Sequence, residues 1–295
     1  MTKLHETTTL AIDGGGTRCR IALTTCGDTL AVQAGSVNVS TDFAAATAEL
    51  MRGLGEVAGR VGATIEELVH VPAYIGLAGV TGPVVVERLA AALPMRDIRI
   101  EDDRPSALRG ALGEKDGIVV HCGTGSFAAS RIDGKSRFAG GWGPVLGDEA
   151  SAQWVGRRAL SRALDTVDGF IPETALTRSL LDEFGGAPAI VAFAGGASPA
   201  ELGALAVGVT QNAAKGDQIA CRILQDAADF VAAISRNLGW NTGLSICLTG
   251  GIGPHYKDYL PDEMRDAVAP ALGEPLNGAI ALAEEYREEI AHGRR

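Results

Sequence analysis

The chain has 295 residues, of which 46% are apolar and 21% are charged, and its formal net charge is −10. This length suggests one large domain or two ordinary ones, with enough apolar residues for a sizeable core. The acidic balance, without a basic stripe, argues against a nucleic-acid partner. No apolar run approaches the ~20 residues of a membrane span. The five scattered cysteines form no CxxC pair and the start of the chain does not resemble a signal peptide, so we expect a cytoplasmic protein with reduced thiols and no membrane contact.

The first half of the chain predicts the element order βββαβαβα. Apolar runs and turn residues predict strands over 8–13, 18–25, 27–35, 70–79 and 97–102. Helical spacing of apolar residues predicts helices over about 42–58, 82–93 and 105–113. Strands that alternate with helices in this way are typical of an α/β domain with a largely parallel sheet.

The second half repeats the opening of the first. Strands are expected over 117–122, 126–133 and 136–140, followed by a long helical region over about 148–238 that is broken near 188–199. A late strand over 244–251 and a closing helix over 279–293 complete the pattern. We therefore predict an N-terminal domain over 1–114 and a C-terminal domain with a helical insertion over 115–275. The closing helix, about 276–293, should pack back on the first domain.

Two glycine-rich turns stand at equivalent places in the two halves, each between two predicted strands. The sequence contains no GxxxxGK[ST], and the stretch AIDGGGTRCRIAL lacks the third glycine of a dinucleotide fingerprint and continues as a strand. The glycines therefore belong to β-hairpins, which either are ordinary tight turns or aim backbone N–H groups and hydroxyls at phosphate oxygens. The candidate nucleotide-binding residues of these turns are Gly14, Gly15, Gly16, Thr17, Gly123, Thr124 and Gly125.

DGGGT near the start, GTGS in the middle and TGGIG near the end occur in the order of the superfamily that holds sugar kinases, actin and heat-shock chaperones. Within it the chain resembles the BadF/BadG/BcrA/BcrD ATPase family over nearly its whole length. The segments AGSVNVS (34–40), DDRPSALRGA (102–111) and GGWGPVLGDEAS (140–151) resemble the N-acetylglucosamine and glucosamine kinases of that family. The resemblance implies two RNase-H-like (actin-like ATPase) α/β domains with an interdomain active-site cleft.

The resemblance also implies an activity: ATP- and Mg²⁺-dependent transfer of a phosphoryl group to the 6-hydroxyl of an amino sugar, with N-acetylglucosamine first and glucosamine second. Its partner is then a small-molecule sugar, and the family allows a homodimer. Two alternatives stay open. One is an ATPase activator of an acyl-CoA dehydratase, whose cluster would need suitably placed cysteines. The other is a sugar-sensing regulator without enzymatic activity.

Two carboxylates are the candidates for the chemistry. Asp13 precedes the first glycines, and it either orients magnesium through water or caps the turn. Asp103 follows the 97–102 strand, at the mouth of the predicted sheet, and aligns with the base of the resembled kinases. Its alternative role is to cap the helix that begins near Pro105, and Asp102 is the rival carboxylate.

The resemblance assigns sugar contacts to Asn38, Asp103, Thr124, Gly141, Trp142 and Asp148. Three of these residues have a simpler interpretation: Asn38 as a turn residue, Trp142 as a core residue and Asp148 as a helix cap. Gly250 and Gly251 follow the late strand and either lie beneath adenosine or form a plain turn. We expect Arg18 and Arg20 to be solvated strand residues, with a phosphate contact as the alternative, and we interpret His121 as a core residue.

Overall fold

The computed structural model describes residues 4–15 and 18–293. The chain divides into two compact units, which are described separately here: Met1–Glu114 with Ala271–Arg295 form unit 1, and Lys115–Pro270 form unit 2. Among the helices described, none is both long and apolar enough to cross a membrane.

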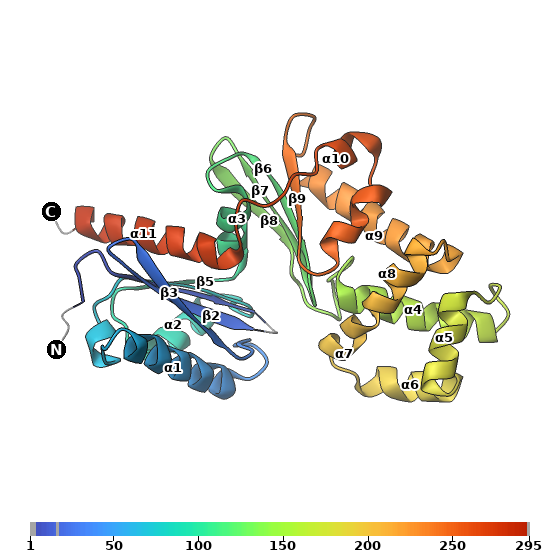
Figure 1. Cartoon of the computed structure of the whole chain (residues 1–295), viewed down its shortest axis with the longest axis horizontal. Helices are drawn as coiled ribbons and strands as arrows, with labels where there is room; N and C mark the ends of the chain where they lie inside the picture. Colours follow the sequence, from blue (N-terminus) through green and yellow to red (C-terminus); the bar gives the residue numbers. More distant parts are fainter. Residues whose placement is uncertain (1–3, 16–17, 294–295) are drawn as a thin grey trace. The chain divides into compact units, whose positions relative to one another are not determined.

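Unit 1 is a five-stranded sheet with helices on both faces (Figure 1). The strand order is β3-β2-β1-β4-β5, in which β1, β2 and β3 are antiparallel and β4 and β5 run parallel to β1. The strands are β1 (Thr9–Gly14), β2 (Cys19–Thr25), β3 (Asp28–Ala34), β4 (Ala73–Leu77) and β5 (Ile98–Glu101). The helices are α1 (Phe43–Arg60), η1 (Glu66–Leu68), α2 (Pro83–Ala92), α3 (Arg104–Leu112) and α11 (Pro275–Gly293).

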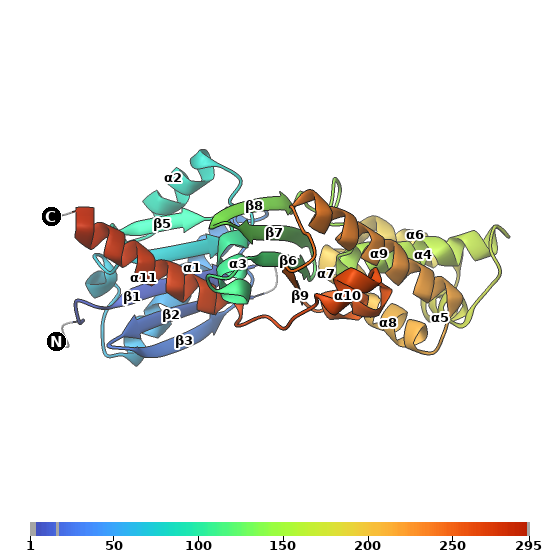
Figure 2. The ribbon, with the colours of Figure 1, turned by 90° about the horizontal axis from the view of Figure 1, so that it is seen from above.

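The two faces of this sheet carry side chains of different size. Leu10 and Ile12 of β1 point into the larger core, which includes residues of α1 and α2. Ala11 points to the other face, where it packs with Ala279 and Ala283 of α11. Successive strand residues face opposite sides of a sheet, so this alternation of large and small residues lets α11 lie close against the strands (Figure 2).

Helices α3 and α11 cross at two glycines. A Cβ atom on Gly278 would collide with the backbone carbonyl of Ser106, and one on Gly110 would collide with that of Glu274. Unit 1 resumes at Ala271, and the Leu272 N–H donates to Ala111 O at 2.9 Å. The late segment of the chain therefore holds the helix that begins next to Asp103.

Unit 2 is a four-stranded sheet in the order β8-β7-β6-β9, with β9 parallel to β6. Its strands are β6 (Gly117–Cys122), β7 (Ser126–Ile132), β8 (Lys135–Gly140) and β9 (Ser245–Thr249). The helices on one side of this sheet (Figure 1) are α4 (Ala152–Val167), α5 (Ala175–Phe184), α6 (Ala187–Gly196), α7 (Pro199–Ala204), α8 (Ala206–Ala214) and α9 (Gln218–Asn237). Two further helices follow β9, namely η2 (Gly253–Tyr259) and α10 (Asp262–Asp266). Both sheets therefore have the same topology: a three-stranded antiparallel meander, with a further strand pairing in parallel with its first strand.

One local expectation is only partly confirmed. The segment 188–199, where a break is expected, is mostly the helix α6. The breaks lie on either side of it: Gly185 ends α5 in the left-handed region, and Ser198 begins α7 with a capping box to Glu201. Pro188 lies in the first turn of α6, where its missing N–H costs nothing.

Candidate functional site

The candidate residues of unit 1 gather at one edge of its sheet. Because β1, β4 and β5 are parallel, their carboxyl ends meet at the same edge. Asp13 lies at the end of β1, and Asp103 follows the end of β5. The two carboxylates are close enough for the charge of Asp13 to raise the pKa of Asp103.

Asp13 is half-buried and ion-paired. Its Oδ2 accepts a hydrogen bond from Arg20 Nη2 at 3.0 Å, and Arg20 also pairs with Glu274. Burial raises the pKa of Asp13, and the hydrogen bond from Arg20 works against this rise. Arg18 is exposed as expected, but the solvated interpretation of Arg20 is wrong, because its side chain is only 15% exposed. The strand register could have indicated the pair, since Asp13 lies opposite Arg20 across the hairpin.

Asp103 stands directly before α3. It occupies the cap position, yet its side chain makes no capping hydrogen bond, and Pro105 lies in the first turn. Burial, together with the charges of Asp102 and Asp13, raises the pKa of Asp103 to about 7. A carboxylate in this range can both accept and release a proton near neutral pH.

Asp102, the rival carboxylate, is occupied by its neighbour. Its Oδ1 accepts hydrogen bonds from the Arg104 backbone N–H at 3.0 Å and from Arg104 Nε at 2.7 Å, and its Oδ2 accepts one from Arg104 Nη2 at 3.0 Å. The Ser106 hydroxyl donates to Asp103 O at 2.9 Å. Arg104 thus pairs with Asp102, and Asp103 is the carboxylate with a raised pKa at the start of α3.

The loop that carries Asn38 lies at the same edge of the unit 1 sheet. The Val37 N–H donates to Gly15 O at 3.1 Å and the Val39 N–H to Ala78 O at 3.4 Å, so the loop spans the ends of β1 and β4. Asn38 Oδ1 accepts hydrogen bonds from the backbone N–H and hydroxyl of Ser40, at 3.1 and 2.7 Å. The side chain therefore stabilises a turn with its oxygen, and its Nδ2 remains a possible donor to a ligand.

The first glycine turn is described only in part, because Gly16 and Thr17 lie outside the described residues. A Cβ atom on Gly14 would collide with the side chain of Leu77. The Gly15 N–H donates to Arg18 O at 2.9 Å and closes the hairpin. Close packing against β4 thus explains why residue 14 is glycine, and the backbone amide of Gly15 is used to close the hairpin.

The second glycine turn joins β6 to β7 in unit 2. The Gly123 N–H donates to Gly125 O at 2.9 Å, and the Ala152 N–H at the start of α4 donates to Gly123 O at 2.8 Å. A Cβ atom on Gly125 would lie 2.9 Å from Asp148 Oδ2. The turn that carries Thr124 is therefore fixed between the start of α4 and the Asp148 carboxylate.

Asp148 is 7% exposed and has a left-handed backbone, with φ at +59°. Its Oδ1 accepts a hydrogen bond from the Ser126 N–H at 3.4 Å. Burial raises the pKa of Asp148, whereas hydrogen bonds from the backbone of Ser126 and Gly143 lower it. It is not the helix cap, because the Ser151 hydroxyl caps α4 by accepting from the Trp154 N–H at 3.2 Å.

Trp142 is 74% exposed, so the alternative that it belongs to the core is wrong. It follows Gly141, whose φ is +77° and whose N–H donates to Ser126 O at 2.9 Å. Val145 and Leu146 of the same loop are also largely exposed. The loop therefore presents large apolar side chains beside the β7 segment that Asp148 contacts.

Gly250 and Gly251 have different surroundings. Gly250 has φ at +80°, and a Cβ atom there would strike the Cys122 carbonyl and lie 2.7 Å from Gly123 N. Gly251 has nothing within 4 Å of its Cβ direction. Backbone contacts within unit 2 thus require a glycine at position 250, whereas Gly251 faces open space. Unit 2 brings this turn, the 123–125 turn and Asp148 together.

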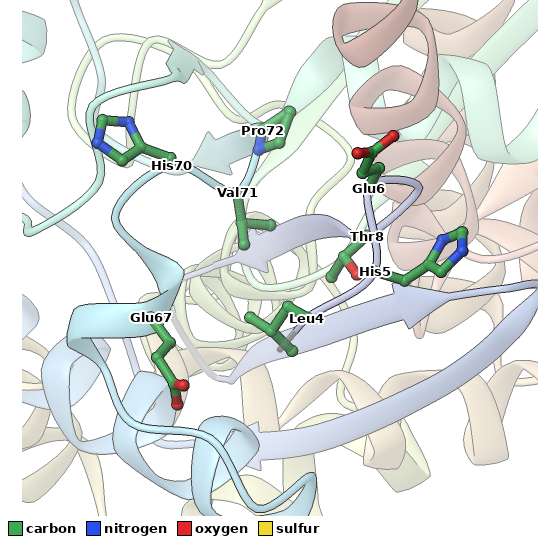
Figure 3. A pocket seen from close by; sticks show the side chains of 8 residues that line it. All are labelled: Leu4, His5, Glu6, Thr8, Glu67, His70, Val71 and Pro72. Atoms are coloured by element: carbon green, nitrogen blue, oxygen red, sulfur yellow. The ribbon is translucent and has the colours of Figure 1, made fainter. Parts of the chain in front are cut away.

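Metal ligands are sparse in the part of the chain that the structure describes. No group of three or more His, Cys, Asp or Glu side chains there could hold a metal ion. A hollow of about 270 Å³ lies at the amino ends of β1 and β4, at the opposite edge from Asp13. Leu4 and Val71 are among the residues that line it, and the side chains of Glu67 and His70 point away from each other (Figure 3). This hollow belongs to neither group of candidate residues.

Two known kinases are similar to this chain over most of its length. The N-acetylmuramic acid/N-acetylglucosamine kinase of Clostridium acetobutylicum is 28% identical over 87% of this chain and 88% of its own. The glucosamine kinase of Vibrio cholerae is 24% identical over 93% of this chain and 95% of its own.

Solved structures extend the likeness to the fold. The crystal structure of a candidate N-acetylglucosamine kinase from Chromobacterium violaceum is 31% identical, covers 94% of this chain and 98% of its own, and superposes with a TM-score of 0.82. The predicted α/β fold of two RNase-H-like domains is confirmed by this likeness. The model of the BadF/BadG/BcrA/BcrD ATPase family matches residues 10–276. The chain belongs to the BadF/BadG/BcrA/BcrD ATPase family.

Proposed function

We propose that this chain is an ATP-dependent kinase that phosphorylates the 6-hydroxyl of an amino sugar, N-acetylglucosamine first and glucosamine second. The observation that carries the proposal is Asp103, a carboxylate without a capping role whose rival, Asp102, is paired with Arg104. Phosphoryl transfer needs a held triphosphate, a cation and one positioned acceptor oxygen. The relatives that act on amino sugars support the choice of substrate.

Asp103 serves as the general base. Its carboxylate accepts the proton of the sugar hydroxyl as the new bond to phosphorus forms, and its pKa of about 7 suits that task near neutral pH. The helix α3 that follows is pinned by α11 at Gly110 and Gly278, so the base is carried on a rigid element. Positioning of the two reactants supplies much of the rate in such transfers.

The residues present fit a magnesium ion held mainly by phosphates and water. Magnesium is commonly bound through one or two carboxylates together with substrate phosphates, and Asp13 is the carboxylate at the end of β1. Arg20 orients that carboxylate from the neighbouring strand. When bound, the ion would neutralise charge on the phosphates as it develops.

The sugar and nucleotide contacts are proposed residue by residue. Asn38 and Asp148 hydrogen-bond sugar hydroxyls, Thr124 and Gly141 line the same ligand, and Trp142 offers its ring as an apolar wall. The two glycine turns bind the phosphates, and Gly251 lies beneath the adenosine. The open space beside Gly251 supports this last assignment.

An ADP-release assay tests the proposal. N-acetylglucosamine, glucosamine, N-acetylmuramate and the 6-deoxy form of the best substrate are compared, beside Asp103→Asn and Asp102→Asn. We expect sugar-dependent ADP release that the 6-deoxy sugar does not support. Turnover should fall about 100-fold or more in Asp103→Asn, and much less in Asp102→Asn. ATP hydrolysis that ignores every sugar would favour the dehydratase activator, and sugar binding without turnover would favour a regulator.

A further inference from the structure

The three residues that begin with Asp148 have an unusual backbone. Asp148 and Ala150 both have positive φ angles, +59° and +63°, although neither is glycine. Left-handed backbone is unfavourable for residues with a Cβ atom and persists only where the surroundings hold it. Segment 148–150 therefore needs a restraint, and the Asp148 carboxylate depends on that restraint for its direction.

Two side chains hold the carbonyl groups of segment 148–150. The Ser126 hydroxyl donates to Glu149 O at 2.6 Å, and the Tyr256 hydroxyl donates to Ala150 O at 2.5 Å. Tyr256 and Ala150 are fully buried. Burial raises the pKa of the Tyr256 phenol well above its ordinary value, so the hydroxyl stays protonated and remains a donor.

Tyr256 comes from the element that follows the late glycine turn. It lies on η2, a few residues after Gly250 and Gly251, and the Ile252 N–H donates to Cys122 O at 3.1 Å. Cys122 immediately precedes the 123–125 turn. A single short segment, 250–256, thus touches both the turn proposed for phosphate and the segment that carries Asp148.

We propose that Tyr256 is a positioning residue for sugar binding, which holds segment 148–150 in its left-handed form and so aims the Asp148 carboxylate. This inference rests on the proposed function of Asp148. It also links the nucleotide turn to the sugar segment through η2. Without the hydroxyl, the Ala150 carbonyl loses its buried donor and the peptide can relax toward an ordinary φ, which turns Asp148 away from the sugar.

The test compares Tyr256→Phe with Tyr259→Phe, a matched removal of a phenolic hydroxyl from the same element η2. We expect the KM for the amino sugar to rise about three- to tenfold in Tyr256→Phe, as for the loss of one hydrogen bond, with a smaller change in kcat. Tyr259→Phe should behave as the wild type. Ala150→Gly, added to Tyr256→Phe, should restore the KM, because glycine adopts positive φ without steric cost.

Hydrogen exchange of peptides over 148–151 gives a readout that needs no activity. Exchange there should be faster in Tyr256→Phe than in Tyr259→Phe. If the wild type is an active kinase, an unchanged sugar KM in Tyr256→Phe would overturn the inference. So would a raised KM that Ala150→Gly does not lower. A wild type without sugar-dependent turnover would overturn the proposed function instead, and the exchange rates would still decide whether Tyr256 holds the segment.

Discussion

Replacing Asp103 by asparagine should stabilise the protein while it removes turnover. The Asp103 carboxylate is close to two other negative charges, Asp102 and Asp13, in surroundings that raise its pKa from the ordinary 3.8 to about 7. The folded chain therefore pays a free-energy cost to keep this group ionised at neutral pH. Asparagine has nearly the same shape and carries no charge, so it removes the cost.

The magnitude follows from the pKa. A rise from 3.8 to about 7 corresponds to at most about 4 kcal/mol of unfolding free energy above pH 7. Asp103 is partly exposed, so solvent screens some of this, and we expect Asp103→Asn to gain about 1–3 kcal/mol, or roughly 3–10 °C in melting temperature. Below pH 3.8 the carboxyl is neutral in both states, so the gain should grow as pH rises from 4 to 7 and then stay constant.

Thermal unfolding of both proteins between pH 4 and 8.5 measures this gain. Asp102→Asn is the control in which two effects oppose each other, because it breaks the ion pair with Arg104 and also removes a charge that raises the pKa of Asp103, so its gain should be smaller than that of Asp103→Asn. An Asp103→Asn protein no more stable than the wild type at pH 8 would refute the reasoning. So would a gain of the same size at pH 4 and pH 8.

Three further predictions concern the backbone and the pH profile. Gly278→Ala should destabilise unit 1 by about 2 kcal/mol or more in denaturant titrations, since its new methyl group meets a backbone carbonyl of α3. Gly250→Ala should lower the melting temperature of unit 2, whereas Gly251→Ala should leave it unchanged and raise the KM for ATP; equal melting temperatures would contradict this. The kcat/KM for sugar should rise with pH through about 7 as Asp103 ionises, and a flat profile would remove it as the base.

The fold could be read from the sequence because its signals are local. Glycine turns between alternating apolar runs predict hairpins, and the 13–17 and 123–126 turns do so in both halves of the chain. The sequence did not predict α6, because Pro188 lies at its start and Gly195 and Gly196 lie at its end. Proline and glycine are both taken as helix-breaking residues when only the sequence is considered.

For the candidate site, the sequence predicts where the residues lie along the chain and in the sheet, but not the contacts of their side chains. The strand ends locate Asp13 and Asp103 at one edge, because parallel strands share their carboxyl edge. The choice between Asp102 and Asp103 needs side-chain geometry, since only the direction of Arg104 decides which carboxylate is paired. The Tyr256 contact joins residues 106 positions apart, and no local pattern carries such a pairing.

The crossing of α3 and α11 has a consequence for how the protein is made. Unit 2 is one continuous stretch, whereas unit 1 is completed by a segment that follows all of unit 2. Translation delivers the chain in order, so unit 2 leaves the ribosome whole while the helix beside Asp103 still lacks its covering neighbour. The Asp103 carboxylate is thus set in place by the part of unit 1 that is synthesised last.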